Sequence, residues 1–379
     1  MNRRSNSCPR SNRLLLHGSF LGDNFGDTLL LRIFRDRIDN LGYDINMNVT
    51  RASRHSAEFA GLQSIGRVKA LFLSGPVLFC GGGYFGEPPR RRARWSIRCW
   101  RRHILLGLSI MLQRRPYTVQ GVGFGPLSKW WIRWPILLLM RRAKSVSVRD
   151  EKSSSYLSSY AKGKARHIVS ADAVLSVPQD YLEALAAQSS SSGSANSSQK
   201  TMLVHLPGPE YTQRARKMVA SAVMNEANAN DQFDIIVASD SKVGFEPSFF
   251  QWFRDGGLGG RVFFHPFRGP SDLLQLISST DWVITSKLHV GVCAAVMRKA
   301  MLAFPNHHKT KRFYQQIGRD ELCVSHDSLN ARDLKPIISD LAADRIPPVS
   351  IPPVVKRDAD RIWRKVSLFL NESGFESAR

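Results

Sequence analysis

Short apolar runs alternate with amphipathic segments along this 379-residue chain, and this alternation constrains the fold most strongly. In the first half the apolar runs are residues 14–20, 43–49, 77–83, 117–125 and 145–150, and the helical patterns include 27–41, 90–115 and 130–142. In the second half the apolar runs are 201–208, 233–240, 261–267, 282–286 and 300–305, and the helical patterns include 214–227, 247–253, 271–279 and 287–300. Strands that alternate with helices indicate parallel sheets joined by crossover helices. The sequence therefore predicts an α/β protein with two doubly wound domains.

A serine-rich segment, QSSSSGSANSSQ at 188–199, separates the two halves. We expect an N-terminal domain over 13–185, a linker or loop over 186–199 and a C-terminal domain over 200–379 that includes a last helix at about 359–370. Chains of this length commonly form two domains.

Basic residues outnumber acidic ones, which gives a net charge of +23. Residues 88–149 contain 15 Lys or Arg and no Asp or Glu. Such a charge predicts an anionic partner: nucleic acid, anionic lipid or a phosphorylated substrate. The segment Arg90–Arg115 has the pattern of an amphipathic helix, which either rests on an anionic membrane surface or packs its apolar stripe into a domain core. No motif of a specific nucleic-acid reader accompanies it, so we expect no specific nucleic acid partner.

Five scattered cysteines without zinc-site spacing indicate a reducing compartment. The N-terminus lacks the apolar core and cleavage site of a signal peptide, and no apolar run reaches the roughly 20 residues of a membrane span. We expect a cytoplasmic protein, peripheral at the inner face of the membrane if the basic segment binds lipid.

Three glycine-rich segments follow predicted strands and are candidates for close contact with a ligand: 18–27, 79–88 and 120–126. The glycine spacing at 121–125 does not match a dinucleotide fingerprint. Two further strand ends carry charged groups. Arg149 precedes Asp150, and it either binds a carboxylate or phosphate or pairs with Asp150 at a helix start. Lys287 and His289 lie two residues apart where a strand meets a small-residue helix, and histidine exchanges protons near neutral pH.

Taken in order, these segments resemble the motifs of the polysaccharide pyruvyl transferase family. The matching segments are Asn24-Phe25-Gly26-Asp27, Gly81-Gly82-Gly83, Gly123-Phe124-Gly125-Pro126, Val148-Arg149-Asp150 and Lys287-Leu288-His289-Val290-Gly291. The resemblance covers roughly residues 13–318. Lysine replaces the family's usual arginine at 287, and Val290 separates His289 from Gly291; the bidentate geometry of arginine is therefore lost at 287.

The resemblance implies two Rossmann-like domains in a glycosyltransferase-B-like arrangement, with the acceptor on the N-terminal and the donor on the C-terminal domain. It implies phosphoenolpyruvate as donor and a polysaccharide or lipid-linked sugar with two nearby hydroxyls as acceptor, giving a pyruvate ketal and phosphate. We expect neither a cofactor nor a metal.

The candidate residues follow from the same motifs. His289 is the expected acid and base, with His307 and His308 as alternatives, and Arg149 and Lys287 are the expected anion-binding catalytic groups. The expected substrate-binding residues are Asn24, Gly26, Asp27, Gly81, Gly82, Gly83, Gly123, Lys309 and Arg312.

Two other functions remain open. One is a nucleotide-sugar-dependent glycosyltransferase of the same architecture, because a fold does not fix an activity. The other is a non-catalytic protein that binds a membrane or polyanion through residues 88–149.

Overall fold

A computed structural model describes residues 12–88, 91–189, 199–208, 212–230, 233–240, 251, 253, 255, 259–305, 307–325 and 331–375. The chain forms two compact units. The first comprises the described residues up to Asp23, Asp27–Ser176 and the described residues from Lys356 onward. The second comprises Asn24–Gly26 and Val177–Val355.

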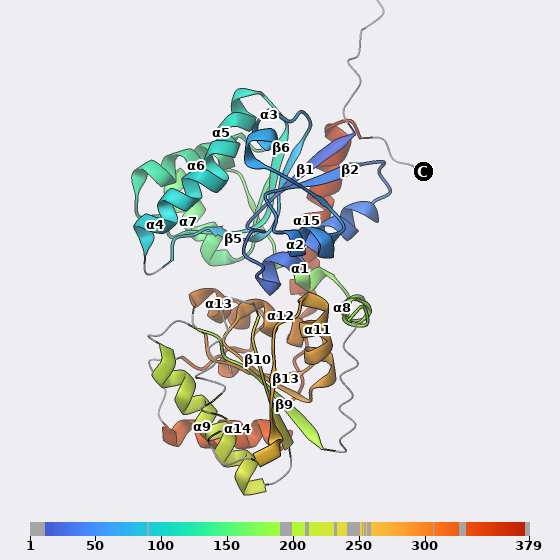
Figure 1. Cartoon of the computed structure of the whole chain (residues 1–379). Coiled ribbons are helices and arrows are strands. Elements are labelled where there is room, and N and C mark those ends of the chain that lie inside the picture. The colour runs from blue at the N-terminus through green and yellow to red at the C-terminus, as the bar shows by residue number, and fades with distance from the viewer. Residues whose placement is uncertain are drawn as a thin grey trace, which may run out of the picture. The chain divides into compact units, whose positions relative to one another are not determined.

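A parallel sheet forms the centre of the first unit (Figure 1). Its strands lie in the order β3-β2-β1-β4-β6-β7-β8, and β5 pairs with the second half of β6. Because β1 lies between β2 and β4, the winding direction reverses beside it, which is where open α/β sheets bind ligands. The strands are β1 (Arg13–His17), β2 (Asn46–Thr50), β3 (Gln63–Ile65), β4 (Val77–Phe79), β5 (Gly82–Phe85), β6 (Tyr117–Phe124), β7 (Val146–Val148) and β8 (Ile168–Val169).

Helices cover both faces of this sheet, with α4, α5 and α6 on one side and α1 and α15 on the other (Figure 1). A π-helical turn, Trp100–Ile104, links α4 to α5. The helices are α1 (Phe25–Asp39), α2 (Arg54–Ala60), α3 (Arg67–Phe72), α4 (Arg92–Cys99), α5 (Leu105–Leu112), α6 (Trp130–Arg142), α7 (Glu151–Ala161) and α15 (Pro353–Glu372).

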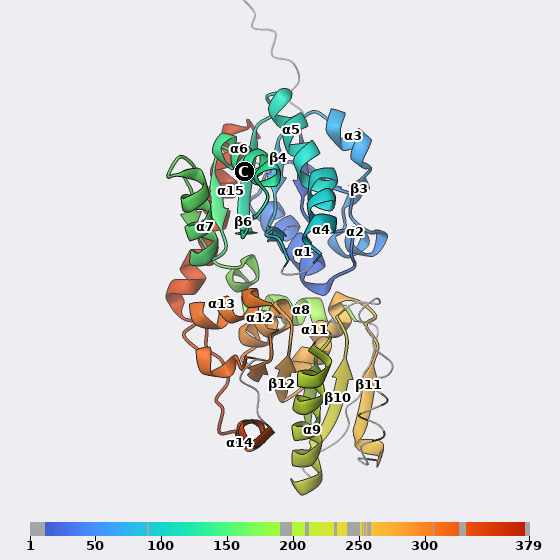
Figure 2. The ribbon, with the colours of Figure 1, turned by 90° about the vertical axis from the view of Figure 1, so that its left-hand side faces the viewer.

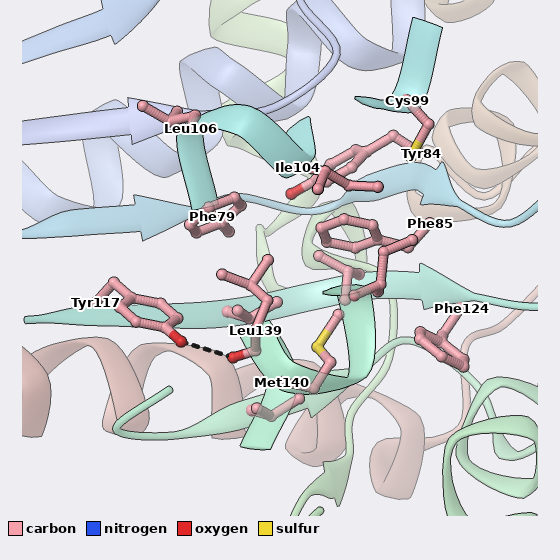
Figure 3. Packing of buried hydrophobic residues seen from close by; sticks show 14 of the residues in the cluster. Phe79, Tyr84, Phe85, Cys99, Ile104, Leu106, Tyr117, Phe124, Leu139 and Met140 are labelled. Atoms are coloured by element: carbon pink, nitrogen blue, oxygen red, sulfur yellow. Dashed lines mark hydrogen bonds between the residues drawn. The ribbon is translucent and has the colours of Figure 1, made fainter. Parts of the chain in front are cut away.

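The core under α4–α6 is aromatic and aliphatic, as Figure 3 shows. Phe79, Phe85 and Phe124 are almost completely buried. The Tyr117 hydroxyl, buried in the same core, donates a hydrogen bond to the Leu139 carbonyl oxygen at 2.8 Å. Burial of this apolar surface is the main stabilising contribution to the layer.

The last helix packs on the first unit, which corrects the expected C-terminal domain of 200–379. Ile362 lies against β6, at 3.0 Å from where a Cβ on Gly121 would stand. The Trp363 ring meets Phe34 at 5.0 Å between centroids, and its Nε1 donates to Ser176 Oγ at 2.8 Å. The apolar side of α15 therefore completes the face that α1 leaves partly open.

A five-stranded parallel sheet, ordered β11-β10-β9-β12-β13, forms the centre of the second unit. The strands are β9 (Lys200–His205), β10 (Phe233–Ala238), β11 (Val262–His265), β12 (Trp282–Thr285) and β13 (Ala300–Ala303). The helices include α8 (Gln179–Ala186), α9 (Gln213–Asn230), α11 (Pro270–Ser279), α12 (Leu288–Val296), α13 (His308–Gln316) and α14 (Ala331–Ala342).

The expected fold of two doubly wound units is confirmed, with different boundaries. The first unit's main segment ends at Ser176 and not at 185, because α8 packs against α11 of the second unit. Most of the expected linker, and the helix expected at 247–253, lie outside the described residues. No helix in the described part of the chain is both long and apolar enough to span a bilayer.

Candidate functional site

Polar groups gather at the carboxyl edge of the second sheet. His205 ends β9, Asp240 follows β10, and Lys287 follows β12. These three strands are neighbours in the order β10-β9-β12, so their ends lie side by side at the point where the winding reverses. The ends of β9 and β12 are joined by a hydrogen bond from the backbone N–H of Ser286 to the His205 carbonyl oxygen at 2.9 Å.

A buried carboxylate anchors this cluster. Asp240 is only 3% exposed, and its Oδ2 lies 3.1 Å from Lys287 Nζ. The Asn24 side-chain amide reaches the same oxygen at 3.5 Å, and the Phe25 N–H donates to the Asp240 carbonyl oxygen at 3.2 Å. Asp240 thus holds both the lysine and the turn at Asn24–Gly26.

The imidazole of His289 lies directly against Gly26. A Cβ on Gly26 would stand 1.9 Å from His289 Nδ1, so only glycine fits beside this ring. The Gly26 N–H donates to Asn24 Oδ1 at 3.1 Å, which holds the turn in shape. His289 lies in the first turn of α12, whose N-cap is Lys287, and N–H groups of a first helical turn attract anions.

A second histidine, His205, completes the edge. It is fully buried, and its Nδ1 is 3.1 Å from Thr285 Oγ1. Burial lowers the pKa of His205 to about 4 in spite of the opposing charge of Asp240, so the ring is neutral at neutral pH. Neither His205 nor Asp240 was among the sequence candidates, although each ends an apolar run.

Lys309 and Arg312 lie on α13, which follows β13 at the same edge. Their side chains are half-buried. His307 is the N-cap of this helix, and its Nδ1 accepts a hydrogen bond from the Lys309 N–H at 3.2 Å. This contact gives His307 a structural role, whereas the His308 side chain is exposed.

Arg149 lies in the first unit and is committed to an ion pair. Its Nη1 is 3.2 Å from Asp172 Oδ2, and both side chains are almost fully buried. Asp150 caps α7 by accepting from the Ser153 N–H at 2.7 Å, so Arg149 pairs with Asp172 and not with Asp150. The other nitrogen, Nη2, makes no hydrogen bond to the described residues and lies 3.0 Å from a Cβ built on Gly123.

The glycine segment at 81–83 brings strand backbones together in the first unit. A Cβ on Gly81 would meet the Gly121 carbonyl oxygen at 3.2 Å, and Gly82 adopts φ +116°, which favours glycine. A Cβ on Gly82 would be 3.5 Å from Asp27 Oδ1, which places Asp27 beside this segment. Gly83 continues β5, a strand that the sequence patterns did not predict.

A buried histidine pair lies at the carboxyl edge of the first sheet. His17 Nε2 is 2.9 Å from His103 Nδ1, and His17 Nδ1 contacts Thr50 Oγ1. Burial lowers the pKa of His17 to about 3 and that of His103 well below its usual range, so both are neutral. The pair ties the π turn of Trp100–Ile104 to the ends of β1 and β2.

The described cysteines are buried or half-buried thiols. Burial raises the pKa of Cys99 to about 12 and that of Cys323 to about 11. Within the described residues, no three His, Cys, Asp or Glu side chains lie close enough together to hold a metal ion.

The second unit therefore assembles four of the sequence candidates, Asn24, Gly26, Lys287 and His289, around Asp240. Arg149, Asp27 and the glycines at 81–83 and 123 lie in the first unit. The assembled cluster offers a cation, an imidazole and a helix N-terminus, which suit binding of an anion and transfer of a proton.

Comparisons with known proteins identify both a family and a fold. The model of the polysaccharide pyruvyl transferase family matches residues 24–308. No curated protein sequence matches the chain at a significant level.

Solved structures with similar folds cover almost the whole chain. A putative UDP-N-acetylglucosamine 2-epimerase from Listeria monocytogenes has a TM-score of 0.67 at 11% identity, covering 96% of this chain and 97% of that one. UDP-GlcNAc 2-epimerase from Neisseria meningitidis, bound to UDP-GlcNAc, has a TM-score of 0.63 at 11% identity, covering 93% and 99%. A glycosyltransferase from Rickettsia africae has a TM-score of 0.54 at 11% identity, covering 97% and 94%. At these identities the similarity shows the fold alone.

Proposed function

This chain belongs to the polysaccharide pyruvyl transferase family, and from that premise we propose that it transfers the enolpyruvyl group of phosphoenolpyruvate to a sugar. Two hydroxyls of a polysaccharide or lipid-linked sugar become bridged as a pyruvate ketal, and inorganic phosphate is released. The donor is a substrate, and the reaction uses no cofactor.

The chemistry requires two additions to one carbon. A proton reaches the methylene carbon of the donor while the first hydroxyl adds to C2 and loses its own proton. Phosphate then leaves with the electrons of the C2–O bond, and the second hydroxyl adds to the resulting cation and loses its proton. One proton is taken up by carbon, two are lost from the hydroxyls, and the excess proton leaves with phosphate.

The observation that supports this proposal best is the packing of His289 against Gly26 beside Lys287. Two motifs far apart in sequence meet there, and they supply the groups that the reaction needs. We assign His289 to proton transfer, and Lys287 with the first turn of α12 to the charge of the donor. Asp240 positions Lys287, and the neutral His205 is close enough to both that their charges act on its pKa.

Arg149 has a narrower role than the sequence motif implies. Nη1 is held by Asp172, whereas Nη2 makes no hydrogen bond to the described residues and is the terminal nitrogen we expect to meet a substrate anion. We therefore expect Arg149 to contact a substrate oxygen through Nη2, in place of a two-pronged contact through both terminal nitrogens.

The test is incubation of the purified protein with phosphoenolpyruvate and a panel of sugar acceptors. We expect phosphate release and a product heavier than the acceptor by one pyruvic acid less one water. His289→Gln should remove both signals while leaving the melting temperature unchanged. Phosphate release without a ketal product, or full activity of His289→Gln, would contradict the assignment.

The structural similarity to a UDP-GlcNAc 2-epimerase and to a glycosyltransferase supports a second candidate, a nucleotide-sugar-dependent glycosyltransferase. Thermal shift separates the two, because a ligand that binds only the folded protein raises its melting temperature. A shift with phosphoenolpyruvate but not with UDP-sugars supports pyruvyl transfer. A shift with UDP-sugars alone would favour the second candidate.

We further propose that the enzyme works in the cytoplasm, at the inner face of the membrane. A lipid-linked acceptor would be available there to a peripheral enzyme.

A further inference from the structure

Four arginines converge at the carboxyl edge of the first sheet, on elements that carry none of the residues assigned to catalysis. Arg51 follows β2, Arg67 begins α3, and Arg101 and Arg102 belong to the π turn. Arg67 Nη1 donates to the Arg101 carbonyl oxygen at 3.2 Å, which joins α3 to the turn. We call these four residues the arginine cluster.

The backbone around the arginine cluster is unusual at two points. Arg51 adopts φ +49°, a left-handed conformation that disfavours side chains other than those of Gly, Asn and Asp. The π turn is a rare element that recurs at functional sites. The hydrogen bond between His103 and His17 holds this turn against the strand ends, so the cluster is preorganised.

No carboxylate within the described residues forms an ion pair with the arginine cluster, and the charges that act on Arg51 and Arg102 are those of other guanidiniums. Burial and then the charges of Arg67 and Arg102 lower the pKa of Arg51. Burial, followed by the charges of Arg98 and Arg101, lowers the pKa of Arg102. Concentrating like charges in this way costs folding energy, which bound anions would relieve.

Exposed apolar side chains accompany the cluster on the same helices. Val68 and Phe72, one turn apart on α3, are 69% and 78% exposed. Leu105 and Leu112, two turns apart on α5, are 43% and 87% exposed. The two helices pack together, because Ser109 Oγ of α5 donates to the Leu71 carbonyl oxygen at 2.9 Å. Figures 1 and 2 both show α3 and α5 side by side at one end of the unit.

These residues differ from the apolar stripe that the sequence pattern suggested. The stripe of the segment Arg90–Arg115 includes Trp95, Cys99 and Ile104, which pack into the core, as in the interpretation of the segment as a domain helix. The exposed apolar residues are a second set, and one half of it lies on α3, outside the basic segment. A surface that combines guanidiniums with protruding apolar side chains is complementary to an anionic bilayer.

We propose that α3, the π turn and α5 dock this protein on an anionic lipid bilayer. The arginine cluster binds lipid phosphates, and Phe72 and Leu112 insert among the acyl chains near the head groups. The docking is independent of the transferase chemistry.

Co-sedimentation with vesicles tests the proposal, comparing phosphatidylcholine alone with phosphatidylcholine containing phosphatidylglycerol. The wild type should bind the anionic vesicles and lose binding as salt increases. Arg101→Gln/Arg102→Gln should reduce partitioning at least ten-fold, because each basic residue near the surface contributes about 1 kcal/mol. Phe72→Ser/Leu112→Ser should also reduce partitioning at least ten-fold, because the apolar area that inserts among the acyl chains is lost. The serine substitutions leave the core intact, because both side chains are exposed.

Matched controls lie on α15. Leu368→Ser removes an exposed leucine, and Arg357→Gln/Arg364→Gln removes the same charge as the cluster variant; both should bind like the wild type. The proposal would be overturned if the control variants lost as much vesicle binding as the test variants, or if Phe72→Ser/Leu112→Ser bound like the wild type. Either result would indicate that the net positive charge of the protein alone attracts anionic surfaces. Equal binding to neutral vesicles would also overturn it. Pyruvyl transfer to a water-soluble acceptor should persist in all variants. The vesicle-binding test does not depend on this activity, so it remains valid even if no pyruvyl transfer is detected.

Discussion

Position 26 has room for the hydrogen atom of glycine but not for the methyl group of alanine. Residue 26 lies in α1, where Ala is normally preferred to Gly by about 1 kcal/mol. The ring of His289 fills the space that a methyl group would need. A substitution that is favourable for the helix is therefore unfavourable for the proposed chemistry.

We predict that Gly26→Ala displaces His289 and lowers kcat by about 10²–10⁴, the usual contribution of a positioned acid or base. Gly22→Ala is the control, because nothing lies within 4 Å of a Cβ there. Steady-state rates of both variants provide the comparison. If Gly26→Ala kept wild-type activity, His289 would not be the group that transfers the proton.

Arg149 provides a second prediction at this scale. Arg149→Ala removes the buried ion pair with Asp172 and should destabilise the first unit by about 3–5 kcal/mol. Thermal denaturation without ligand measures this cost, and Arg149→Lys should recover part of it. If Arg149→Ala melts like the wild type and loses only donor binding, the arginine serves the substrate and not the fold.

The sequence identified candidate residues at the ends of individual strands, but not the residues that contact them in the folded protein. Lys287, His289 and the turn at 24–26 were predicted because each carries a local pattern of glycine or charge. Asp240 and His205 were missed, since their importance arises from the pairing of β10 and β12 with β9, which is long-range. The Asp172 partner of Arg149 was missed for the same reason.

Among the elements, the strands were largely predictable and the destination of the last helix was not. A short apolar run is enough to predict a buried strand. The surface on which an amphipathic helix packs depends on the arrangement of all the other elements in its unit. α15 shows an amphipathic pattern in sequence, and only the structure shows that this face covers β6 and α1. The short strand β5 was also missed, because its glycines argue against a strand.

We predict that Ile362→Ala destabilises the first unit by about 2–5 kcal/mol, since the side chain is fully buried against Gly121. Leu368→Ala, on the exposed side of the same helix, should change stability by less than about 0.5 kcal/mol. Hydrogen exchange should show the lost protection in β1, β4 and β6 and not in β9–β13. Lost protection confined to β9–β13 would contradict the placement of α15.

Across the whole molecule, buried neutral histidines occur in both units. His17, His103 and His205 all have pKa values below the usual 6.5 because of burial. In the unfolded chain these rings take up protons as the pH falls through about 6.5, whereas in the folded protein they do not. Stability is therefore fully present above this pH and is lost on acidification, down to about pH 4 for His205.

We predict a fall in stability of roughly 1.4 kcal/mol per pH unit for each such histidine within that window. His205→Asn keeps a polar group near Thr285 Oγ1. It should reduce the slope of stability against pH by the contribution of one proton, about 1.4 kcal/mol per pH unit. Melting temperatures recorded from pH 7.5 to 4.5 measure the effect. An unchanged slope in His205→Asn would show that His205 is protonated in the folded protein.

The burial of the described thiols has a practical consequence for spectroscopy. Thiolates are the reactive form toward maleimides, and the raised pKa values of Cys99 and Cys323 keep both thiols protonated and slow to react. With Cys8 replaced by serine, Phe72→Cys would present one fast-reacting sulfur on an otherwise unreactive background. An environment-sensitive dye attached there would shift its emission on contact with lipid, so the proposed docking and its depth are open to direct optical measurement.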